Sequence, residues 1–166
     1  MMFKGLLVFA LLFSFSASAT LVGTVDVQKV LLSVKEGKKV RDKLKKEFEK
    51  KQAELKKEED KIRKAQEDFK KQSLVLSDAA KIKKQESIQK MIMALQQKSM
   101  GYQKEIQGLE AELKKPLLNK IRKIVEEVSK KEKVDLTFEL SVAPIIYAKN
   151  QKNLTDLVIK AYDKTK

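Results

Sequence analysis

Apolar residues recur at intervals of seven in the first half of a highly charged central region. They are Phe48, Leu55, Ile62, Phe69 and Leu76. A second set, apolar at seven of its eight positions, alternates spacings of four and three: Ile88, Ile92, Leu95, Ser99, Tyr102, Ile106, Leu109 and Leu113. Such spacings place side chains on one face of a helix, as in the seam of a coiled coil. The pattern predicts two long helices that pair as an antiparallel hairpin over residues 38–115.

The turn of this hairpin is predicted between Leu74 and Ala80, where the first apolar set ends. Ser77 or Asp78 can begin the second helix, because short polar side chains accept hydrogen bonds from the first free N–H groups. Each arm is then about 55–60 Å long at 1.5 Å per residue. The first arm has essentially one apolar residue per heptad, so we expect it to bend more easily than a full coiled coil.

The segment before the hairpin has two short patterns. Leu21–Val27 alternates like a strand with one buried face, and Gln28–Val34 has helical spacing. Gly37 then marks the entry to the hairpin.

The segment after the hairpin begins at Pro116, which predicts either a kink in the returning helix or the start of a new one. Val134–Leu140 alternates strictly and predicts a strand, and Ile145–Ala148 predicts a second strand that pairs with it as a β-hairpin. Thr155 is typical of an N-cap. The last helix is expected to bury Leu157, Val158, Ala161 and Tyr162.

Together these patterns predict a mainly helical α+β protein. The helical hairpin, 38–115, is inserted into a small β-containing body made of residues 20–37 and 116–166. A three-stranded sheet has open edges, which favours an oligomer. We expect the oligomer body to involve six apolar residues: Val25, Val27, Leu136, Phe138, Leu140 and Ile146.

Residues 1–19 have the three parts of a secretory signal peptide. Lys4 supplies a positive charge, Leu6–Phe15 is apolar, and small residues ending at Ala19 form a cleavage site. The apolar run is too short to span a bilayer. The sequence therefore predicts export from the cytoplasm, with cleavage after Ala19.

The sign and position of the charge indicate the kind of partner. The whole chain has a formal net charge of +14, and residues 38–115 contain 23 basic and 14 acidic residues. A basic hairpin with apolar residues at its tip suits a loose grip on unfolded acidic chains. The alternative is a solvated helix face with a packed turn. The candidate contacts are Lys70, Lys71, Leu74, Val75, Leu76, Lys81, Lys83 and Lys84.

No catalytic constellation is present in the sequence. The chain has no Cys and no His, and it contains neither of the common glycine-rich nucleotide-binding motifs. Glu58, Glu59 and Asp60 are consecutive, so on a helix their side chains fan around the axis instead of converging on a metal. We expect no enzymatic activity, no cofactor and no metal site.

The arrangement resembles the Skp/OmpH family of periplasmic chaperones. The resemblance rests on the signal peptide, the opening strand at Val22–Val27, the basic hairpin, and the C-terminal third with Val134-Asp135-Leu136, Tyr147 and Leu154-Thr155-Asp156. It implies a homotrimer with a β-rich body and three helical tentacles around a cavity. It also implies a periplasmic holdase that binds unfolded outer-membrane proteins without ATP.

Two other classes of function stay open at this point. One is a structural or adaptor coiled-coil protein of the cell envelope, which would have a defined folded partner. The other is a basic protein that binds nucleic acid or anionic lipid. Export argues against nucleic acid, and the hairpin lacks interleaved aromatic residues for stacking bases. Contact with anionic lipid or lipopolysaccharide remains open as a secondary property, with no residue assigned to it.

Overall fold

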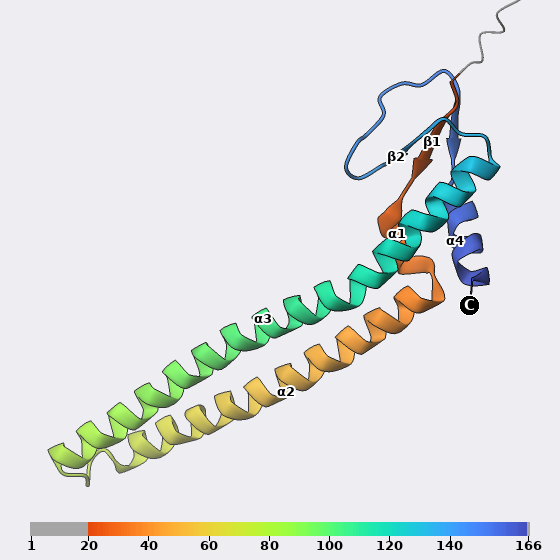
Figure 1. Cartoon of the computed structure of the whole chain (residues 1–166). Coiled ribbons are helices and arrows are strands. Elements are labelled where there is room, and N and C mark those ends of the chain that lie inside the picture. Colours follow the sequence, from red (N-terminus) through yellow and green to blue (C-terminus); the bar gives the residue numbers. More distant parts are fainter. Residues whose placement is uncertain (1–19, 166) are drawn as a thin grey trace, which may run out of the picture.

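The computed structural model describes residues 20–165, which form a small body and a long projecting hairpin (Figure 1). The predicted signal peptide lies outside the described residues. The elements in chain order are β1 (Val22–Val25), α1 (Val27–Ser33), α2 (Lys35–Gln72), α3 (Asp78–Lys131), β2 (Leu136–Glu139), β3 (Gln151–Asn153) and α4 (Thr155–Lys164). The protein is mainly helical with one small sheet, in agreement with the predicted fold class.

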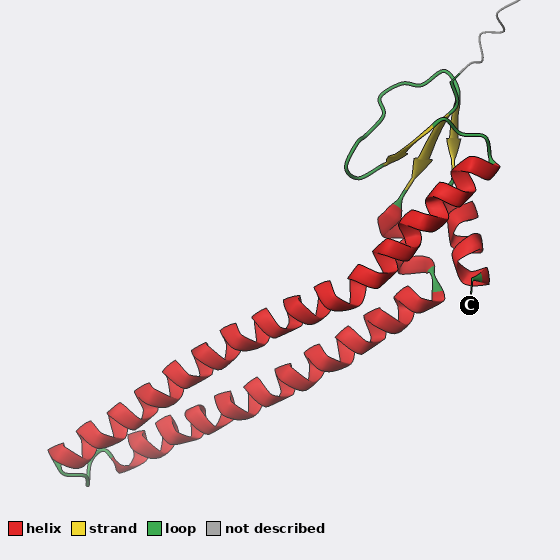
Figure 2. Ribbon diagram, in the orientation of Figure 1, coloured by secondary structure: helices red, strands yellow, loops and turns green. Residues whose placement is uncertain are grey.

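The hairpin consists of α2 and the first two thirds of α3, which lie side by side away from the body (Figure 2). The 38 residues of α2 extend about 57 Å. Ser77 caps α3 as predicted, since its hydroxyl accepts a hydrogen bond from the Ala80 N–H at 3.4 Å. Between residues 38 and 115, Ile62 is the one apolar side chain that is buried, with 8% of its surface exposed. The contact between the arms is therefore thin.

Gly37 lies inside α2, which begins at Lys35, and so does not separate the helix from the preceding segment. A Cβ at this position would lie 1.7 Å from the Leu31 carbonyl oxygen. The close approach of α1 to α2 explains why a residue that disfavours helices stands in the first turn. The first N–H of α2, that of Lys35, donates to the Asp163 carboxylate of α4 at 3.0 Å.

Pro116 lies within α3, and the helix continues through it into the body. The alternative of a new helix start at this residue is therefore wrong. Beyond it, α3 buries a row of side chains against the body, and this packing holds the helix together despite the missing proline N–H. These residues are Leu117, Ile121, Ile124 and Val128.

The three strands are parallel and lie in the order β2-β1-β3. The predicted β-hairpin is wrong, because Ile145–Ala148 is a loop and the third strand is the polar segment Gln151–Asn153. Backbone hydrogen bonds decide this pairing: the Leu154 N–H donates to the Thr24 carbonyl at 2.8 Å beside β3. The apolar residue Ile146 therefore lies in a loop, where it is fully exposed.

Two helices, α1 and α4, begin one residue earlier than predicted. Asp26 accepts a hydrogen bond from the Lys29 N–H at 2.7 Å and ends the strand, so Val27 is the first residue of α1 and not part of β1. Thr155 is likewise the first residue of α4 and not its cap. Its N–H donates to the Asn153 side chain at 2.9 Å, and its buried hydroxyl accepts the Asp26 N–H at 3.0 Å.

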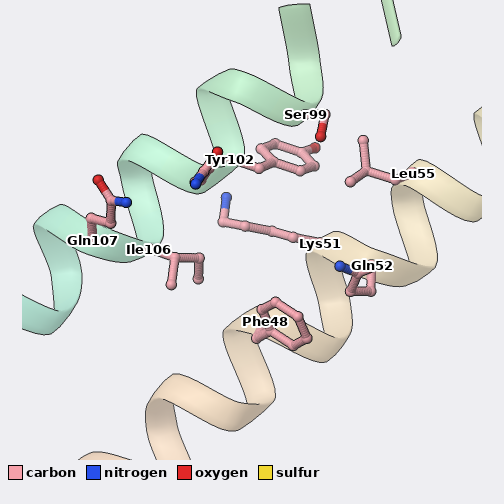
Figure 3. A pocket seen from close by; sticks show the side chains of 9 residues that line it. Phe48, Lys51, Gln52, Leu55, Ser99, Tyr102, Ile106 and Gln107 are labelled. Atoms are coloured by element: carbon pink, nitrogen blue, oxygen red, sulfur yellow. The ribbon is translucent and has the colours of Figure 1, made fainter. Parts of the chain in front are cut away.

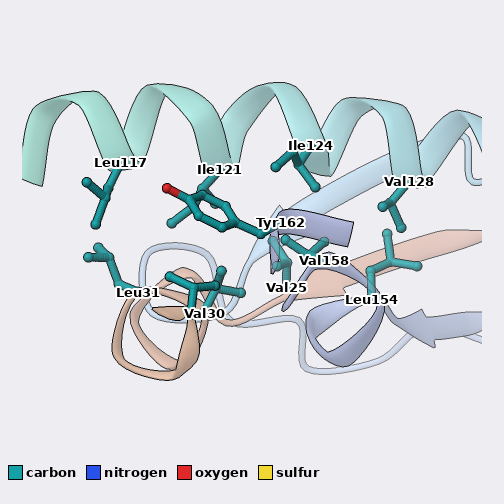
Figure 4. Packing of buried hydrophobic residues seen from close by; sticks show 11 residues of the cluster. Val25, Val30, Leu31, Leu117, Ile121, Ile124, Val128, Leu154, Val158 and Tyr162 are labelled. Atoms are coloured by element: carbon teal, nitrogen blue, oxygen red, sulfur yellow. The ribbon is translucent and has the colours of Figure 1, made fainter. Parts of the chain in front are cut away.

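The core of the body lies where one face of α3 meets α1, β1 and α4 (Figure 4). Val158 and Tyr162 of α4 are buried as predicted, with Leu157 and Ala161 partly buried beside them. The core residues are Val25, Val30, Leu31, Val34, Leu117, Ile121, Ile124, Val128, Leu154, Val158 and Tyr162. This core fixes the base of the hairpin, while its far end has no packing against the body.

Candidate functional site

The hairpin tip, residues 70–84, consists of the last turn of α2, the connecting turn and the first two turns of α3. Leu74 is 94% exposed and Val75 is 84% exposed, so both apolar side chains face solvent. Leu76 differs from them because it is half-buried in the turn. The structure therefore separates the three predicted apolar contacts into two exposed residues and one that packs locally.

The five lysines of the tip also fall into two groups. Lys81 pairs with Asp78 at 3.3 Å, and Lys84 donates a hydrogen bond to Gln72 at 2.5 Å. Lys70, Lys71 and Lys83 are exposed, and none of them belongs to an ion pair found within residues 20–165. The exposed charge of the tip is thus carried mainly by these three residues, close to Leu74 and Val75.

A polar cluster joins the two arms in the middle of the hairpin. Lys51 of α2 pairs with Glu105 of α3, and its ammonium lies 4.1 Å from the centre of the Tyr102 ring. The Tyr102 hydroxyl donates to the Glu54 carboxylate, and Lys98 lies 3.8 Å from the same carboxylate. In this part of the hairpin, charged and aromatic side chains hold the two arms together, whereas a coiled coil normally uses apolar side chains for this contact.

These contacts shift the titration of the groups involved. The hydrogen bond to Glu105 raises the pKa of Lys51 above its usual value. The hydrogen bond from Tyr102 lowers the pKa of Glu54, and the same bond raises the pKa of the Tyr102 hydroxyl. Lys51 therefore keeps its charge and Tyr102 keeps its proton above neutral pH, and Glu54 keeps its charge below neutral pH.

A cleft of about 330 Å³ opens beside this cluster between α2 and α3 (Figure 3). Phe48, Leu55 and Ile106 supply apolar surface, and Lys51 and Tyr102 supply polar groups. Sequence patterns alone did not point to this cleft. The available signal was Tyr102 together with Ser99, two residues with hydroxyl groups at positions of the seam that are otherwise apolar.

The body carries a second exposed apolar surface on β2 and the loop after it. In the single chain Thr137 and Glu139 of β2 are the more buried residues, while Leu136 and Phe138 are exposed. Val25 is buried in the core and Val27 is half-buried. The exposed apolar residues of this surface are Leu136, Phe138, Leu140, Val142, Ile146 and Tyr147.

Glu139 ties this surface to the rest of the body. Its carboxylate accepts hydrogen bonds from the Ser141 hydroxyl at 2.6 Å, the Val142 N–H at 2.8 Å and the Val27 N–H at 3.3 Å. The Ser141 hydroxyl and these backbone groups lower the pKa of Glu139. One carboxylate thus joins the end of β2, the following loop and the first turn of α1.

Neither a membrane-spanning helix nor a metal-binding cluster is found in residues 20–165. No helix there combines the length and the apolar character needed to cross a membrane. In the same residues, no group of three or more acidic side chains is placed to hold a metal ion.

The family model for outer membrane proteins of the OmpH-like kind matches residues 21–162. This chain belongs to the OmpH-like family. An uncharacterized protein from Aquifex aeolicus (strain VF5) is 30% identical over 140 residues, which cover 84% of each chain. The fold is similar to the crystal structure of an OmpH-like protein from Caulobacter crescentus CB15, proposed to be an outer membrane chaperone. That comparison has a TM-score of 0.71 at 18% identity and covers 89% of this chain and 85% of the other.

Proposed function

We propose that this OmpH-like protein is an ATP-independent holdase chaperone that binds unfolded outer-membrane proteins and prevents their aggregation. The observation that carries the proposal is the hairpin tip. Lys70, Lys71 and Lys83 project beside the exposed Leu74 and Val75, far from the packed body. Family membership and the description of the Caulobacter protein as a chaperone support the same role.

Capture by this tip proceeds in two physical stages. The excess of nine positive charges over residues 38–115 attracts acidic chains over a distance of about 10 Å at 0.1 M salt. Exposed apolar side chains then hold the chain through contacts that do not depend on a particular sequence. The thin contact between α2 and α3 allows the arms to adapt, because little buried area opposes bending.

We propose further that three copies associate through their bodies and enclose a cavity between three hairpins. The apolar surface on β2 and its loop supports association, since exposed apolar patches of this kind mark contacts between proteins. β2 is also an edge strand with unpaired backbone groups. The number three comes from the resemblance to Skp/OmpH proteins.

The expected place of action is the periplasm, after removal of residues 1–19. Nucleic acid is absent from that compartment as a regular partner, so the positive charge is available for proteins. Basic helices also attract anionic head groups, so anionic lipid or lipopolysaccharide is a proposed secondary partner of the same hairpins.

The test is light scattering after an outer-membrane barrel protein is diluted from urea into buffer without nucleotide. The mature chain, residues 20–166, should suppress the scattering when about one trimer is present per barrel protein, and less strongly at 0.5 M than at 0.05 M NaCl. Equal amounts of a folded basic protein provide the control for charge alone.

If the mature chain leaves aggregation unchanged at both salt concentrations, the holdase proposal is wrong. The envelope adaptor then becomes the better hypothesis, and a single folded partner should bind the hairpin. Suppression that persists unchanged at 0.5 M NaCl would retain the holdase but assign capture to apolar contacts instead of charge.

A further inference from the structure

One face of α3 in the hairpin carries exposed side chains without charge. The spacings along this uncharged stripe are 7, 4, 3, 4 and 7, which are close to whole turns of a helix and keep the residues within about 30° of one direction. All are exposed. The uncharged stripe consists of Ile82, Gln89, Met93, Gln96, Met100 and Gln107.

The absence of charge on this stripe contrasts with the rest of the hairpin. Charged residues make up 36% of the chain, and exposed positions on the outer side of α2 are mostly Lys, Arg, Glu or Asp. An ordinary solvated helix face has that charged composition. Along the length of the stripe, the nearest charged residues of α3, Glu86 and Lys104, lie to one side of it.

The side chains of the uncharged stripe offer two kinds of contact. Met93 is 51% exposed and Met100 is 64% exposed, and methionine adapts its shape to irregular apolar surfaces. The glutamine amides each have donors and an acceptor, and they take part in none of the side-chain hydrogen bonds within residues 20–165. Such amides suit a partner whose own backbone N–H and C=O groups lack hydrogen bonds.

The length of the uncharged stripe limits what can bind along it. From Ile82 to Gln107 the helix rises about 37 Å at 1.5 Å per residue. An extended chain covers the same distance with about 11 residues at 3.4 Å each. A membrane-spanning strand of a β-barrel has about 9–11 residues, which alternate between apolar residues facing the lipid, where charge is disfavoured, and polar residues facing the interior.

The end of the uncharged stripe nearest the body opens onto the cleft described above. Gln107 lines that cleft together with Phe48, Tyr102 and Ile106 (Figure 3). The volume of about 330 Å³ accommodates one large side chain. Strands of outer-membrane barrels carry aromatic residues at both ends, so a strand lying on the stripe can place such a residue in the cleft.

We propose that the uncharged stripe binds one extended membrane-spanning strand of an unfolded barrel protein, with its terminal aromatic side chain in the cleft. This inference rests on the proposed holdase function and names the part of the unfolded protein that α3 recognises. It differs from the capture at the tip, because the tip selects acidic chains by charge and the stripe selects neutral strands by apolar and amide contacts.

The experiment measures binding of a fluorescently labelled, urea-denatured eight-stranded barrel protein by fluorescence anisotropy at 0.5 M NaCl, where attraction by the tip is screened. The variant Met93→Lys/Met100→Lys should bind about tenfold more weakly, because two apolar contacts are lost. The control Ser87→Lys/Ala94→Lys adds the same two charges at exposed positions of α3 on another side of the helix and should bind within twofold of the wild type.

A second measurement locates the contact on the barrel protein. The photoreactive residue benzoylphenylalanine at position 100 should crosslink to membrane-spanning strands, and at position 87 it should give few crosslinks. Crosslinks from position 100 mainly to the charged loops of the barrel protein would overturn the proposed substrate class.

The remaining outcomes separate the two proposals. If the wild type holds the barrel protein but Met93→Lys/Met100→Lys binds it equally well, the stripe inference is wrong and the holdase remains. If the wild type fails to bind at any salt concentration, the holdase itself is wrong. A change in the sedimentation coefficient of Met93→Lys/Met100→Lys without client would show that the stripe contacts a second copy, which also overturns the inference.

Discussion

The hydroxyl of Tyr162 in α4 donates a 2.6 Å hydrogen bond to the carboxylate of Glu36 in the first turn of α2. Lys120 of α3 lies against both groups, 3.7 Å from the Glu36 carboxylate and 4.4 Å from the centre of the Tyr162 ring. Three helices therefore meet in one polar contact at the point where the hairpin leaves the body. This contact ties the first turn of α2 to α3 and α4, and so helps to set the direction in which α2 leaves the body.

Replacing Tyr162→Phe should lower the free energy of unfolding by about 1 kcal/mol, because the ring stays packed while the hydrogen bond is lost. Urea unfolding followed by circular dichroism measures the change. Tyr147→Phe is the matched control, since Tyr147 is 82% exposed, and it should leave stability unchanged. Equal stability of Tyr162→Phe and wild type would mean that the bond to Glu36 contributes nothing net.

The same bond predicts a dependence on high pH. Burial, with the nearby Glu36 carboxylate, raises the pKa of the Tyr162 hydroxyl above its ordinary value of 10.0. The folded state therefore holds this proton more tightly than the unfolded state, so the stabilisation is complete below pH 10 and is lost as pH rises above it. The stability difference between wild type and Tyr162→Phe should stay constant from about pH 7 to 9 and shrink above about pH 10.

Gly37→Ala should destabilise the protein by about 3 kcal/mol, because the new methyl group meets the Leu31 backbone at the joint between α1 and α2. Gly101→Ala is the matched control in a helix, where a Cβ meets nothing within 4 Å. It should stabilise by about 0.5–1 kcal/mol through the better helix propensity of alanine. Thermal unfolding of both variants should shift in opposite directions, and a shared direction would contradict the packing described for Gly37.

Removing the charge of the tip should weaken client capture at low salt. Replacement of Lys70, Lys71, Lys81, Lys83 and Lys84 by Gln is expected to lower affinity about tenfold at 0.05 M NaCl, with little difference at 0.5 M. The oligomer should remain intact. The control replaces five exposed lysines of α2 nearer the body and removes the same total charge: Lys39, Lys43, Lys46, Lys50 and Lys57. Equal weakening by both sets would assign capture to overall charge and not to the tip.

Phe138→Asp should dissociate the proposed trimer while leaving the fold of each chain intact. Phe138 is 37% exposed in the single chain, so an added carboxylate is hydrated there but costly in an apolar contact between copies. Sedimentation velocity measures the mass, and circular dichroism confirms the helix content. Leu32→Asp is the control, because Leu32 is exposed in the last turn of α1 and is not part of the apolar surface on β2 and its loop, and it should keep the mass of the wild type.

The helices could be predicted because their signals are local. Periodic apolar positions located both arms, and the short polar residue Ser77 located the start of α3 within a few residues. Tyr162 and Val158 were correctly placed in the core for the same reason. Each of these inferences used residues less than two turns apart.

The sheet could not be predicted in the same way. β3 is an edge strand of Gln151, Lys152 and Asn153, whose side chains carry no apolar alternation, and backbone hydrogen bonds to β1 hold it in place. The apolar run Ile145–Ala148 looked more like a strand but has no partner among the described residues. Likewise, the contact between Tyr162 and Glu36 joins residues 126 positions apart, which no local pattern reveals. Among the candidate contacts, the division between exposed Leu74 and packed Leu76 depends on the detailed shape of the turn.

The parallel pairing of β1 with β2 has a consequence for the order of folding. The Leu21 N–H bonds to the Asp135 carboxylate 114 residues later, and closing a flexible loop of that length costs about 4 kcal/mol of chain entropy. The hairpin removes most of this cost, because its arms can zip together outward from the central turn, and each contact leaves only a short free segment for the next contact to close. We expect the hairpin to fold first and to bring the two ends of the sheet together. The surface that we propose joins one copy to another is then the last part to form, so the proposed assembly would wait for chains whose hairpins are already complete.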